Sequence, residues 1–215
     1  MNGVFITFEG TEGSGKSTQI PLLASRLRSL GHKVRTLREP GGTPIGEELR
    51  HTLKHSGQNR EMRNETELLL MNASRAQLVR EVIRPALAAN EIVLCDRFYD
   101  STIAYQAYGR QLDLQSVRQM IDFAVGQTRP DLTLLLVVSQ RMSEERRLAR
   151  QSTLEFIRDR MEEADRAFFE RVAQGYQAIA AADPKRVRVI DGSGSVQAIE
   201  AEIWKVVEPL LKIKS

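Results

Sequence analysis

The chain has 215 residues, of which 41% are hydrophobic and 27% charged, with a formal net charge of +3. These values are typical of a soluble globular protein and exclude a disordered or fibrous class, so we treat residues 1–215 as a single domain. No apolar run approaches the roughly 20 residues that cross a bilayer, and no export signal precedes the first predicted strand. We therefore expect a cytoplasmic protein that binds no membrane.

Two further classes are excluded by residue usage. A single cysteine and three scattered histidines cannot build a zinc site. The basic residues form no cluster interleaved with aromatic side chains, so we expect no nucleic-acid partner. Cys95 lies inside an apolar run, which favours a small buried hydrophobe over a nucleophile.

Short apolar runs rich in β-branched residues alternate along the chain with longer stretches of helical periodicity. This pattern predicts an α/β fold in which helices cover both faces of a parallel sheet. The predicted strands are Val4–Glu9, Lys33–Arg38, Glu91–Asp96, Leu132–Val138 and Val187–Asp191. The predicted helices are Thr18–Leu30, Ile45–Lys54, Glu65–Ala89, Leu114–Val125, Glu162–Ala182 and Val196–Leu211. The fourth strand is apolar along nearly its whole length, so we expect it in the centre of the sheet.

A glycine-rich segment follows the first predicted strand and fits the phosphate-binding pattern G-x-x-x-x-G-K-[ST]. Its glycines let backbone N–H groups turn toward a phosphate, and the next helix adds the positive end of its dipole. Lys16 would bring a full charge to the transferred phosphoryl group, and Ser17 would offer its hydroxyl to Mg²⁺. The context of strand, loop and helix favours this interpretation over an ordinary turn. The predicted nucleotide-binding residues are Gly10, Thr11, Glu12, Gly13, Ser14, Gly15, Lys16, Ser17 and Thr18.

A second polar segment follows the third predicted strand, at the sheet edge where the glycine-rich loop also opens. Arg97 offers a planar fork for a phosphate, and Asp96 is placed to hold a magnesium-bound water or to orient that arginine. Residues 101–106 alternate hydroxyls with an aromatic ring and an amide, a set that can contact a sugar and a base edge. The alternative is an ordinary helix start, capped by Ser101 and with Tyr105 in the core.

In order and spacing, these segments resemble thymidylate kinases of the bacterial type. The matches lie at residues 9–18, 38–43, 96–106 and 159–162, with 73–75 as a fifth, and they span nearly the whole chain. The resemblance implies a three-layer P-loop fold with a five-stranded parallel sheet and a mobile lid near residues 147–160. It implies transfer of the γ-phosphoryl group of Mg-ATP to dTMP, giving dTDP and ADP. It also implies a homodimer, for which the long third helix offers apolar surface at Leu68, Leu69, Val79 and Val82.

The resemblance also assigns roles to single residues. Arg38 and Arg97 would bind the phosphate of the acceptor, Glu12 its 3′-hydroxyl, and Arg75 a pyrimidine carbonyl. Tyr105 would stand under the sugar and exclude a 2′-hydroxyl. The other expected contacts with the acceptor are Pro40, Met71, Ser101, Thr102 and Gln106.

Several of these assignments have a simpler alternative. Arg38 could be a solvated charge at a strand end, and Arg75 could form a surface ion pair with Glu81. Met71 stands where the family usually has a phenylalanine that stacks on thymine, although a methionine can still lie against a ring. The preference for dTMP over dUMP is therefore left open by the sequence.

Arginines are frequent between Arg141 and Arg166, and we expect most of them to form a charged helix surface. In the family, a phosphate-binding loop without its own arginine goes with a lid that supplies one, and this loop has no basic residue before Lys16. Closure of such a lid would exclude water and bring positive charge to the transferring phosphoryl group. The candidate lid residues are Arg147, Arg150, Arg158 and Arg160.

Three other functions compete with this one. A deoxynucleoside kinase acts on an unphosphorylated hydroxyl, and two arginines that seek phosphate, Arg38 and Arg97, argue against it. A regulatory switch or nucleic-acid-stimulated ATPase would need an N-K-x-D motif or a basic face, and the sequence has neither. An inactive relative is disfavoured because Lys16, Ser17 and Asp96 are all present.

Overall fold

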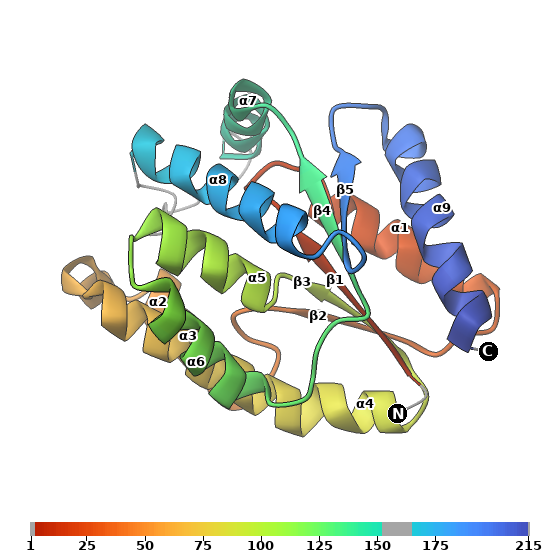
Figure 1. Ribbon diagram of the computed structural model, residues 1–215, viewed down its shortest axis with the longest axis horizontal. Coiled ribbons are helices and arrows are strands. Elements are labelled where there is room, and N and C mark those ends of the chain that lie inside the picture. Colours follow the sequence, from red (N-terminus) through yellow and green to blue (C-terminus); the bar gives the residue numbers. More distant parts are fainter. Residues whose placement is uncertain (1–2, 152–164, 215) are drawn as a thin grey trace.

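The computed structural model describes residues 3–151 and 165–214, and it contains one parallel sheet between two layers of helices (Figure 1). The strands are β1 (Val4–Glu9), β2 (Val34–Arg38), β3 (Ile92–Asp96), β4 (Leu132–Val137) and β5 (Val187–Asp191), in the order β2-β3-β1-β4-β5. The predicted five-stranded parallel sheet is confirmed, with each strand end within one residue of the prediction. The middle strand is β1, while β4 is an internal strand between β1 and β5.

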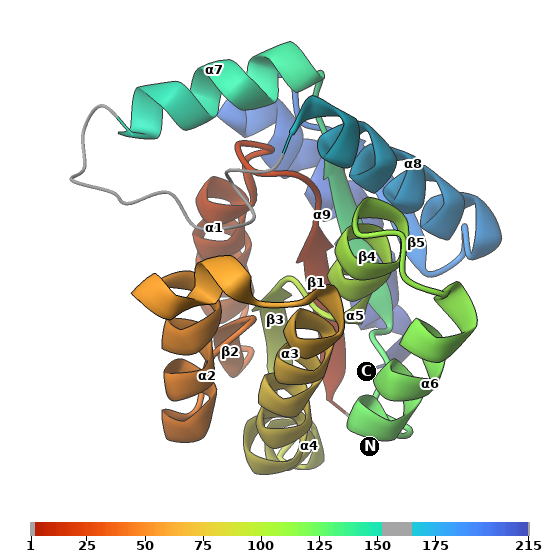
Figure 2. The ribbon, with the colours of Figure 1, turned by 90° about the vertical axis from the view of Figure 1, so that its left-hand side faces the viewer.

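Helices cover both faces of the sheet, as predicted (Figures 1 and 2). They are α1 (Lys16–Ser29), α2 (Pro44–Lys54), α3 (Asn64–Leu78), α4 (Arg84–Ala88), α5 (Tyr99–Thr102), α6 (Leu114–Val125), α7 (Gln140–Gln151), α8 (Arg166–Ala182) and α9 (Val196–Lys214). A π-helical turn, Val79–Ile83, joins α3 to α4, so the predicted helix Glu65–Ala89 is one continuous helical path. A second π-helical segment, Ile103–Gly109, continues α5.

The alternation of side chains along the strands explains the two layers. In β1, Ile6 and Phe8 are fully buried on the side of α1 and α9, together with Leu27 and Ile203. Phe5 is fully buried on the opposite side, where α3, α6 and the first π-helical turn pack. Successive strand residues point to opposite faces, and a strand that is apolar on both faces must be covered twice.

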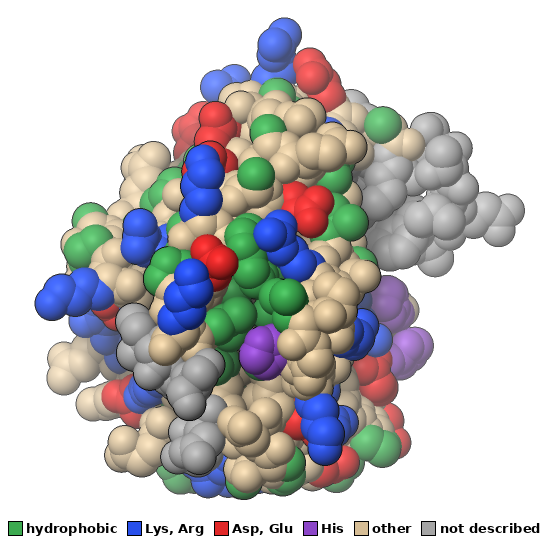
Figure 3. Space-filling view, turned by 90° about the vertical axis from the view of Figure 1, so that its right-hand side faces the viewer, with side chains coloured by type: hydrophobic (Ala, Val, Ile, Leu, Met, Phe, Trp, Pro, Cys, Tyr) green, Lys and Arg blue, Asp and Glu red, His purple; other side chains and the backbone are tan. Residues whose placement is uncertain are grey.

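Figure 3 shows the side of the molecule where α1 and α9 lie, with apolar side chains gathered in a hollow that basic side chains rim. Val34, Trp204 and Leu210 are partly buried hydrophobic residues that pack against the core on this side. The guanidinium of Arg26 lies 3.9 Å from the centre of the Trp204 ring, a cation–π contact that ties α1 to α9. Among the described residues, no helix combines the length and apolar character needed to cross a membrane.

Some predictions need correction or fall outside the described residues. Leu68 and Val79 belong to the core, with 6% and 0% of their surface exposed, so only Leu69, which is 55% exposed, offers clearly free apolar surface on α3. The predicted charged helix surface is present as α7. Arg147 and Arg150 lie in α7, whereas Arg158, Arg160 and the rest of the predicted lid lie outside the described residues. Cys95 is fully buried, as predicted, and burial raises the pKa of its thiol.

Candidate functional site

The glycine-rich loop joins β1 to α1 at the carboxyl edge of the sheet. Gly10 has a φ of +132°, and a Cβ there would lie 2.3 Å from the carbonyl oxygen of Leu136, so β4 allows no side chain at this position. The loop curls around the ammonium group of Lys16, which donates to the carbonyl oxygens of Gly10 and Thr11 at 2.9 Å each and to Ser14 Oγ at 3.3 Å. Lys16 is therefore held at the centre of the loop by oxygens that a phosphate could replace.

Lys16 is 6% exposed and has a second cation, Arg97, nearby. Burial, and after it the charge of Arg97, lowers the pKa of Lys16 to about 8. Both effects disfavour the charged form of an ammonium group. An added anion would reverse them, so the loop is electrostatically prepared for phosphate.

The loop opens into a cavity of about 370 Å³. The loop itself forms one wall, from Glu12 to Thr18, together with Asp96 and Arg97. The other wall is formed by Arg146 of α7 and by Gly194, Val196 and Ile199 near the start of α9. The cavity therefore brings together the predicted residues from Glu12 to Thr18 with Asp96, Arg97 and five residues that the sequence did not indicate, of which the fifth is Gln19 of α1.

Helix α7 rests on the loop through two contacts. Ser143 Oγ donates to the carbonyl oxygen of Glu12 at 2.6 Å, and Arg146 donates to the carbonyl oxygens of Gly13 and Gly192 at 3.2 and 3.1 Å. Arg146 is the one cation among the five unpredicted residues that line the cavity. Its place within an arginine-rich stretch was visible in the sequence, but nothing there separated it from its neighbours.

Asp96 ends β3 beside the loop, and its Oδ1 is buried with no hydrogen-bond partner among the described residues. An unpartnered buried carboxylate oxygen is costly unless something binds to it. Ser17 also lines this cavity. One carboxylate, one hydroxyl and the phosphates of a nucleotide are a donor set that suits Mg²⁺. The described residues contain no group of three or more His, Cys, Asp or Glu side chains that could hold a metal without a ligand.

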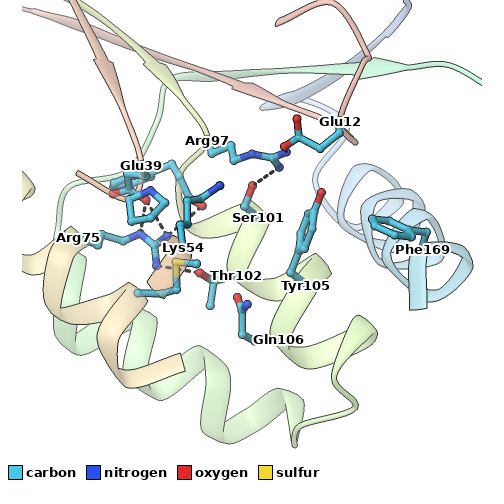
Figure 4. Close-up of a pocket in the computed structure, with 13 residues that line it drawn as sticks. Glu12, Glu39, Lys54, Arg75, Arg97, Ser101, Thr102, Tyr105, Gln106 and Phe169 are labelled. Carbon is cyan, nitrogen blue, oxygen red and sulfur yellow. Dashed lines mark hydrogen bonds and ion pairs between the residues drawn. The ribbon is translucent and has the colours of Figure 1, made fainter. Parts of the chain in front are cut away.

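A second pocket adjoins the first and is drawn in Figure 4. Nine of the predicted residues line it: Glu12, Pro40, Met71, Arg75, Arg97, Ser101, Thr102, Tyr105 and Gln106. The sequence did not indicate the remaining four, Glu39, Lys54, Phe98 and Phe169. Glu12 and Arg97 line both cavities, so these two side chains stand where the cavities meet.

Arg97 lies at the junction of the two pockets. Its backbone has a φ of +68°, rare for a residue with a side chain, and its N–H donates to the carbonyl oxygen of Phe8 at 2.9 Å. One amino group of the guanidinium donates to Glu12 Oε1 at 2.7 Å, and the other to Ser101 Oγ at 3.2 Å (Figure 4). Burial opposes ionisation of Glu12, but the charges of Arg97 and Lys16 outweigh it and hold the pKa of Glu12 well below its ordinary value.

Arg75 is 2% exposed, and its guanidinium makes four hydrogen bonds and an ion pair within the protein. Nε and one amino group bind Glu39 Oε2 at 2.8 and 2.7 Å. That amino group also donates to the carbonyl oxygen of Phe98 at 3.2 Å, and the other donates to Thr102 Oγ1 and Asn72 Oδ1 at 3.0 and 3.1 Å. The alternative of a surface ion pair with Glu81 is therefore wrong. A ligand could take a bond from Arg75 only by replacing one of these acceptors.

A further ion pair supports Gln106, one of the residues that line the second pocket. Gln106 Nε2 donates to Glu67 Oε1 at 2.8 Å, and Arg110 pairs with Glu67 Oε2 at 3.1 Å. Tyr105 stands beside Gln106 with its hydroxyl buried and without a hydrogen-bond partner among the described residues. Burial raises the pKa of Tyr105 to about 12, so its hydroxyl keeps its proton and can donate to a ligand.

Two predictions about the second pocket do not fit the arrangement as it stands. Arg38 is absent from the lining, because its guanidinium donates to Glu47 Oε2 at 3.0 Å and its side chain is 48% exposed. Its binding of an acceptor phosphate stays a prediction. Ser101 does not cap a helix: α5 begins after Phe98, and Ser101 lies inside it.

A phosphate-binding loop at the carboxyl edge of a five-stranded parallel sheet, opening into two joined pockets, defines a nucleotide-binding protein of the P-loop class.

Comparison with known proteins narrows this class. The family model described as "Thymidylate kinase" matches residues 8–203. A thymidylate kinase of Synechococcus sp. is 47% identical over 210 residues, which are 98% of this chain and 97% of the relative. One of Deinococcus radiodurans is 45% identical over 205 residues, 95% of this chain and 96% of the relative. The crystal structure of thymidylate kinase from Ehrlichia chaffeensis superposes with a TM-score of 0.78 at 34% identity and covers 96% of this chain and 98% of that chain.

The chain therefore belongs to the thymidylate kinase family, and it is a kinase whose family reaction converts dTMP to dTDP.

Proposed function

We propose that this chain transfers the γ-phosphoryl group of ATP to the 5′-phosphate of dTMP, with ATP in the cavity around the glycine-rich loop and dTMP in the second pocket. The observation that supports this division is that Glu12 and Arg97 line both cavities. A donor and an acceptor bound on either side would meet at these two residues. Phosphoryl transfer asks a protein mainly for such positioning and for neutralisation of charge.

On the donor side, the phosphates of ATP would replace the loop oxygens that now bind Lys16. Arg146, Val196 and Ile199 form the opposite wall, which offers apolar surface and a guanidinium plane to a base. Ser17 and Asp96 would hold Mg²⁺, directly or through water, and Mg²⁺ would supply charge neutralisation at the phosphates. The unpartnered Oδ1 of Asp96 supports its part in this site.

On the acceptor side, Arg97 would bind the phosphate of dTMP. The phosphate oxygen that attacks is already an anion, so the reaction needs no strong general base. Glu12, held ionised by Arg97 and Lys16, would accept a hydrogen bond from the 3′-hydroxyl. The hydroxyl and ring of Tyr105 would pack under the sugar, and Met71 would lie against the base.

The same proposal includes a cytoplasmic homodimer. Phe123 and Met120 of α6 are 82% and 36% exposed, and Leu69 of α3 is 55% exposed. Helices α3 and α6 are neighbours in the fold, so these apolar side chains stand on adjoining helices (Figure 2). Exposed apolar surface of this kind often marks a contact between chains. Sedimentation equilibrium of the purified protein tests this: a single species of about twice the chain mass is expected, and a monomer at micromolar concentration would contradict it.

A coupled assay of ADP release tests the reaction, with Mg-ATP and one of dTMP, dUMP, ribosyl TMP, thymidine or no acceptor. We expect strong stimulation by dTMP and little by ribosyl TMP, because Tyr105 in its proposed place under the sugar would exclude a 2′-hydroxyl. Equal rates with dTMP and dUMP would support the kinase reaction but would show that the protein does not prefer thymine over uracil. Turnover of thymidine, or ADP release that no acceptor changes, would contradict the proposal.

A further inference from the structure

A cluster of polar side chains lies beside Arg97, and two of its three members have no part in the reaction described so far. Its members, here called the Glu9 cluster, are Glu9, Ser101 and Tyr176. While one amino group of Arg97 faces Glu12, the other donates to Ser101 Oγ at 3.2 Å and to the Tyr176 hydroxyl at 3.4 Å. The Glu9 cluster therefore supports the half of the guanidinium that Glu12 does not hold.

Glu9 is the last residue of β1, is fully buried and has both carboxylate oxygens occupied. Oε1 accepts from the backbone N–H groups of Phe98 and Ser101 at 2.8 and 3.3 Å. Oε2 accepts from Ser101 Oγ at 2.6 Å and from the Tyr176 hydroxyl at 3.0 Å. These four donors fix the carboxylate in one orientation.

The direction of these bonds decides what Arg97 meets. A hydroxyl has one hydrogen and two lone pairs. When Glu9 is ionised, Ser101 and Tyr176 can both donate their hydrogens to it, and both then present lone pairs to Arg97. A neutral Glu9 would need one of these hydroxyls as an acceptor for its own proton; that hydroxyl would direct its hydrogen elsewhere, for example along the 3.0 Å contact between Ser101 Oγ and the Tyr176 hydroxyl, and the hydrogen bonds around Arg97 would be rearranged.

Tyr176 reaches this position from α8, which crosses one face of the sheet (Figure 1). Helix α8 lies close against the second π-helical segment, because a Cβ on Gly175 would come within 3.0 Å of the Cα of Ala104 and within 2.9 Å of the Tyr108 ring. The Tyr176 ring meets the edge of the Tyr105 ring at 6.3 Å between centroids. The hydroxyl of Tyr176 is thus placed by packing that does not depend on its hydrogen bonds.

Packing alone does not explain the presence of this cluster. A buried carboxylate beside a second acid, Asp100, is destabilising, and apolar side chains of similar size would fill the same space without that cost. Burial, and next the charge of Asp100, raises the pKa of Glu9 to about 7. The feature that such a cluster provides and an apolar core cannot is a fixed set of acceptors for a cation.

We propose that Tyr176 and Glu9 are positioning residues for Arg97: Tyr176 and Ser101 hold one amino group of the guanidinium, and Glu9 orients their hydroxyls, so that Arg97 is held in place for the phosphate of the acceptor. The inference rests on the proposed role of Arg97 in binding that phosphate. It assigns a role in acceptor binding to α8, which follows the segment where the lid is predicted.

Removing the Tyr176 hydroxyl alone tests the inference. Tyr176→Phe keeps the ring contact with Tyr105, and Tyr108→Phe, a half-buried tyrosine on the adjacent segment, is the matched control. Dissociation constants for dTMP and thymidine are measured by calorimetry, because Arg97 can contact only the ligand that carries a phosphate. We expect about tenfold weaker binding of dTMP by Tyr176→Phe, the effect of one hydrogen bond to a charged group, with thymidine binding unchanged.

Steady-state kinetics provide the second measurement. The KM for dTMP should rise in Tyr176→Phe while the KM for ATP stays as in the wild type, and Glu9→Gln should show the same selective loss. Tyr108→Phe should change neither.

Two outcomes would overturn the inference. Equal weakening of dTMP and thymidine would show a general loss of structure, and unchanged dTMP binding would show that Arg97 needs no support from Tyr176. If the wild-type protein itself binds dTMP no more tightly than thymidine, the proposed role of Arg97 fails together with the inference. If the wild-type protein binds dTMP more tightly than thymidine and Tyr176→Phe binds dTMP as tightly as the wild type, the inference fails but the proposed role of Arg97 stands.

Discussion

The two joined pockets are built in different ways. The cavity around the glycine-rich loop, proposed for ATP, is called the donor half here, and the second pocket, proposed for dTMP, is called the acceptor half. The donor half is mostly backbone: Lys16 binds carbonyl oxygens of the loop that contains it, and Gly10 has no room for a side chain beside β4. The acceptor half is built from side chains, including the buried pairs of Arg75 with Glu39 and of Arg110 with Glu67. Replacing the Lys16 side chain in the donor half should therefore change the chemistry and leave stability nearly intact, whereas replacing a member of the buried pairs in the acceptor half should change both.

The largest effect on stability is expected for Arg75→Met. This change leaves Glu39 buried with no counter-charge, and breaking a buried pair in this way costs about 3–5 kcal/mol of unfolding free energy. Denaturant unfolding at fixed protein concentration measures it. Arg129→Met is the matched control, because the Arg129–Asp122 pair is 40% and 63% exposed and an exposed pair contributes about 0–1 kcal/mol. Similar losses in the two variants would contradict the comparison.

The donor half is tested by Lys16→Met. The variant loses the cation that we propose faces the transferring phosphoryl group, and kcat should fall about 10²–10³-fold. Because the burial of Lys16 already lowers its pKa to about 8, removal of the charge should leave the unfolding free energy unchanged or higher. Rates and thermal melts on the same preparation check both statements. A large drop in melting temperature would show that the loop depends on Lys16 for its shape.

The smallest effect is a pH dependence from Glu9. With its pKa raised from 4.5 to about 7, the folded protein keeps a proton that the unfolded chain releases between those pH values. The unfolding free energy should therefore fall as pH rises through this window, on the order of 3 kcal/mol in total, and stay level above pH 7 with respect to this group. The difference between wild type and Glu9→Gln isolates this contribution. A pH-independent difference would show that Glu9 titrates normally.

The same comparison explains what could be predicted from the sequence. The donor half follows from a contiguous motif after an apolar strand, and residues 10–18 and the strands around them lie where the sequence placed them. Nine residues of the second pocket were also predicted, on the resemblance to a family. A contiguous motif was sufficient for the first prediction, whereas the second depended on knowledge of the family.

The partners that hold those residues could not be predicted. Glu39 binds Arg75, which is 36 residues away in the sequence, and Tyr176 binds Glu9, which is 167 residues away. No local spacing in the sequence could predict either contact. Glu81 was a candidate partner of Arg75 because it lies near on the same helical path. The Arg75 side chain is instead buried and binds Glu39. Arg146 was missed for a related reason: its role depends on how α7 rests on the loop.

The many partners of the Arg75 guanidinium also limit which substitutions this pocket can accept in the course of evolution. Its four hydrogen bonds end on Glu39, Asn72, Phe98 and Thr102, which come from three separate segments of the chain. Replacing one acceptor leaves a buried N–H group of Arg75 without a partner. A substitution at one of these positions is therefore expected to be accepted only together with a second, compensating substitution. Strong epistasis is therefore expected around Arg75, and resistance to a ligand that occupies this pocket should arise at residues that only line it, such as Met71.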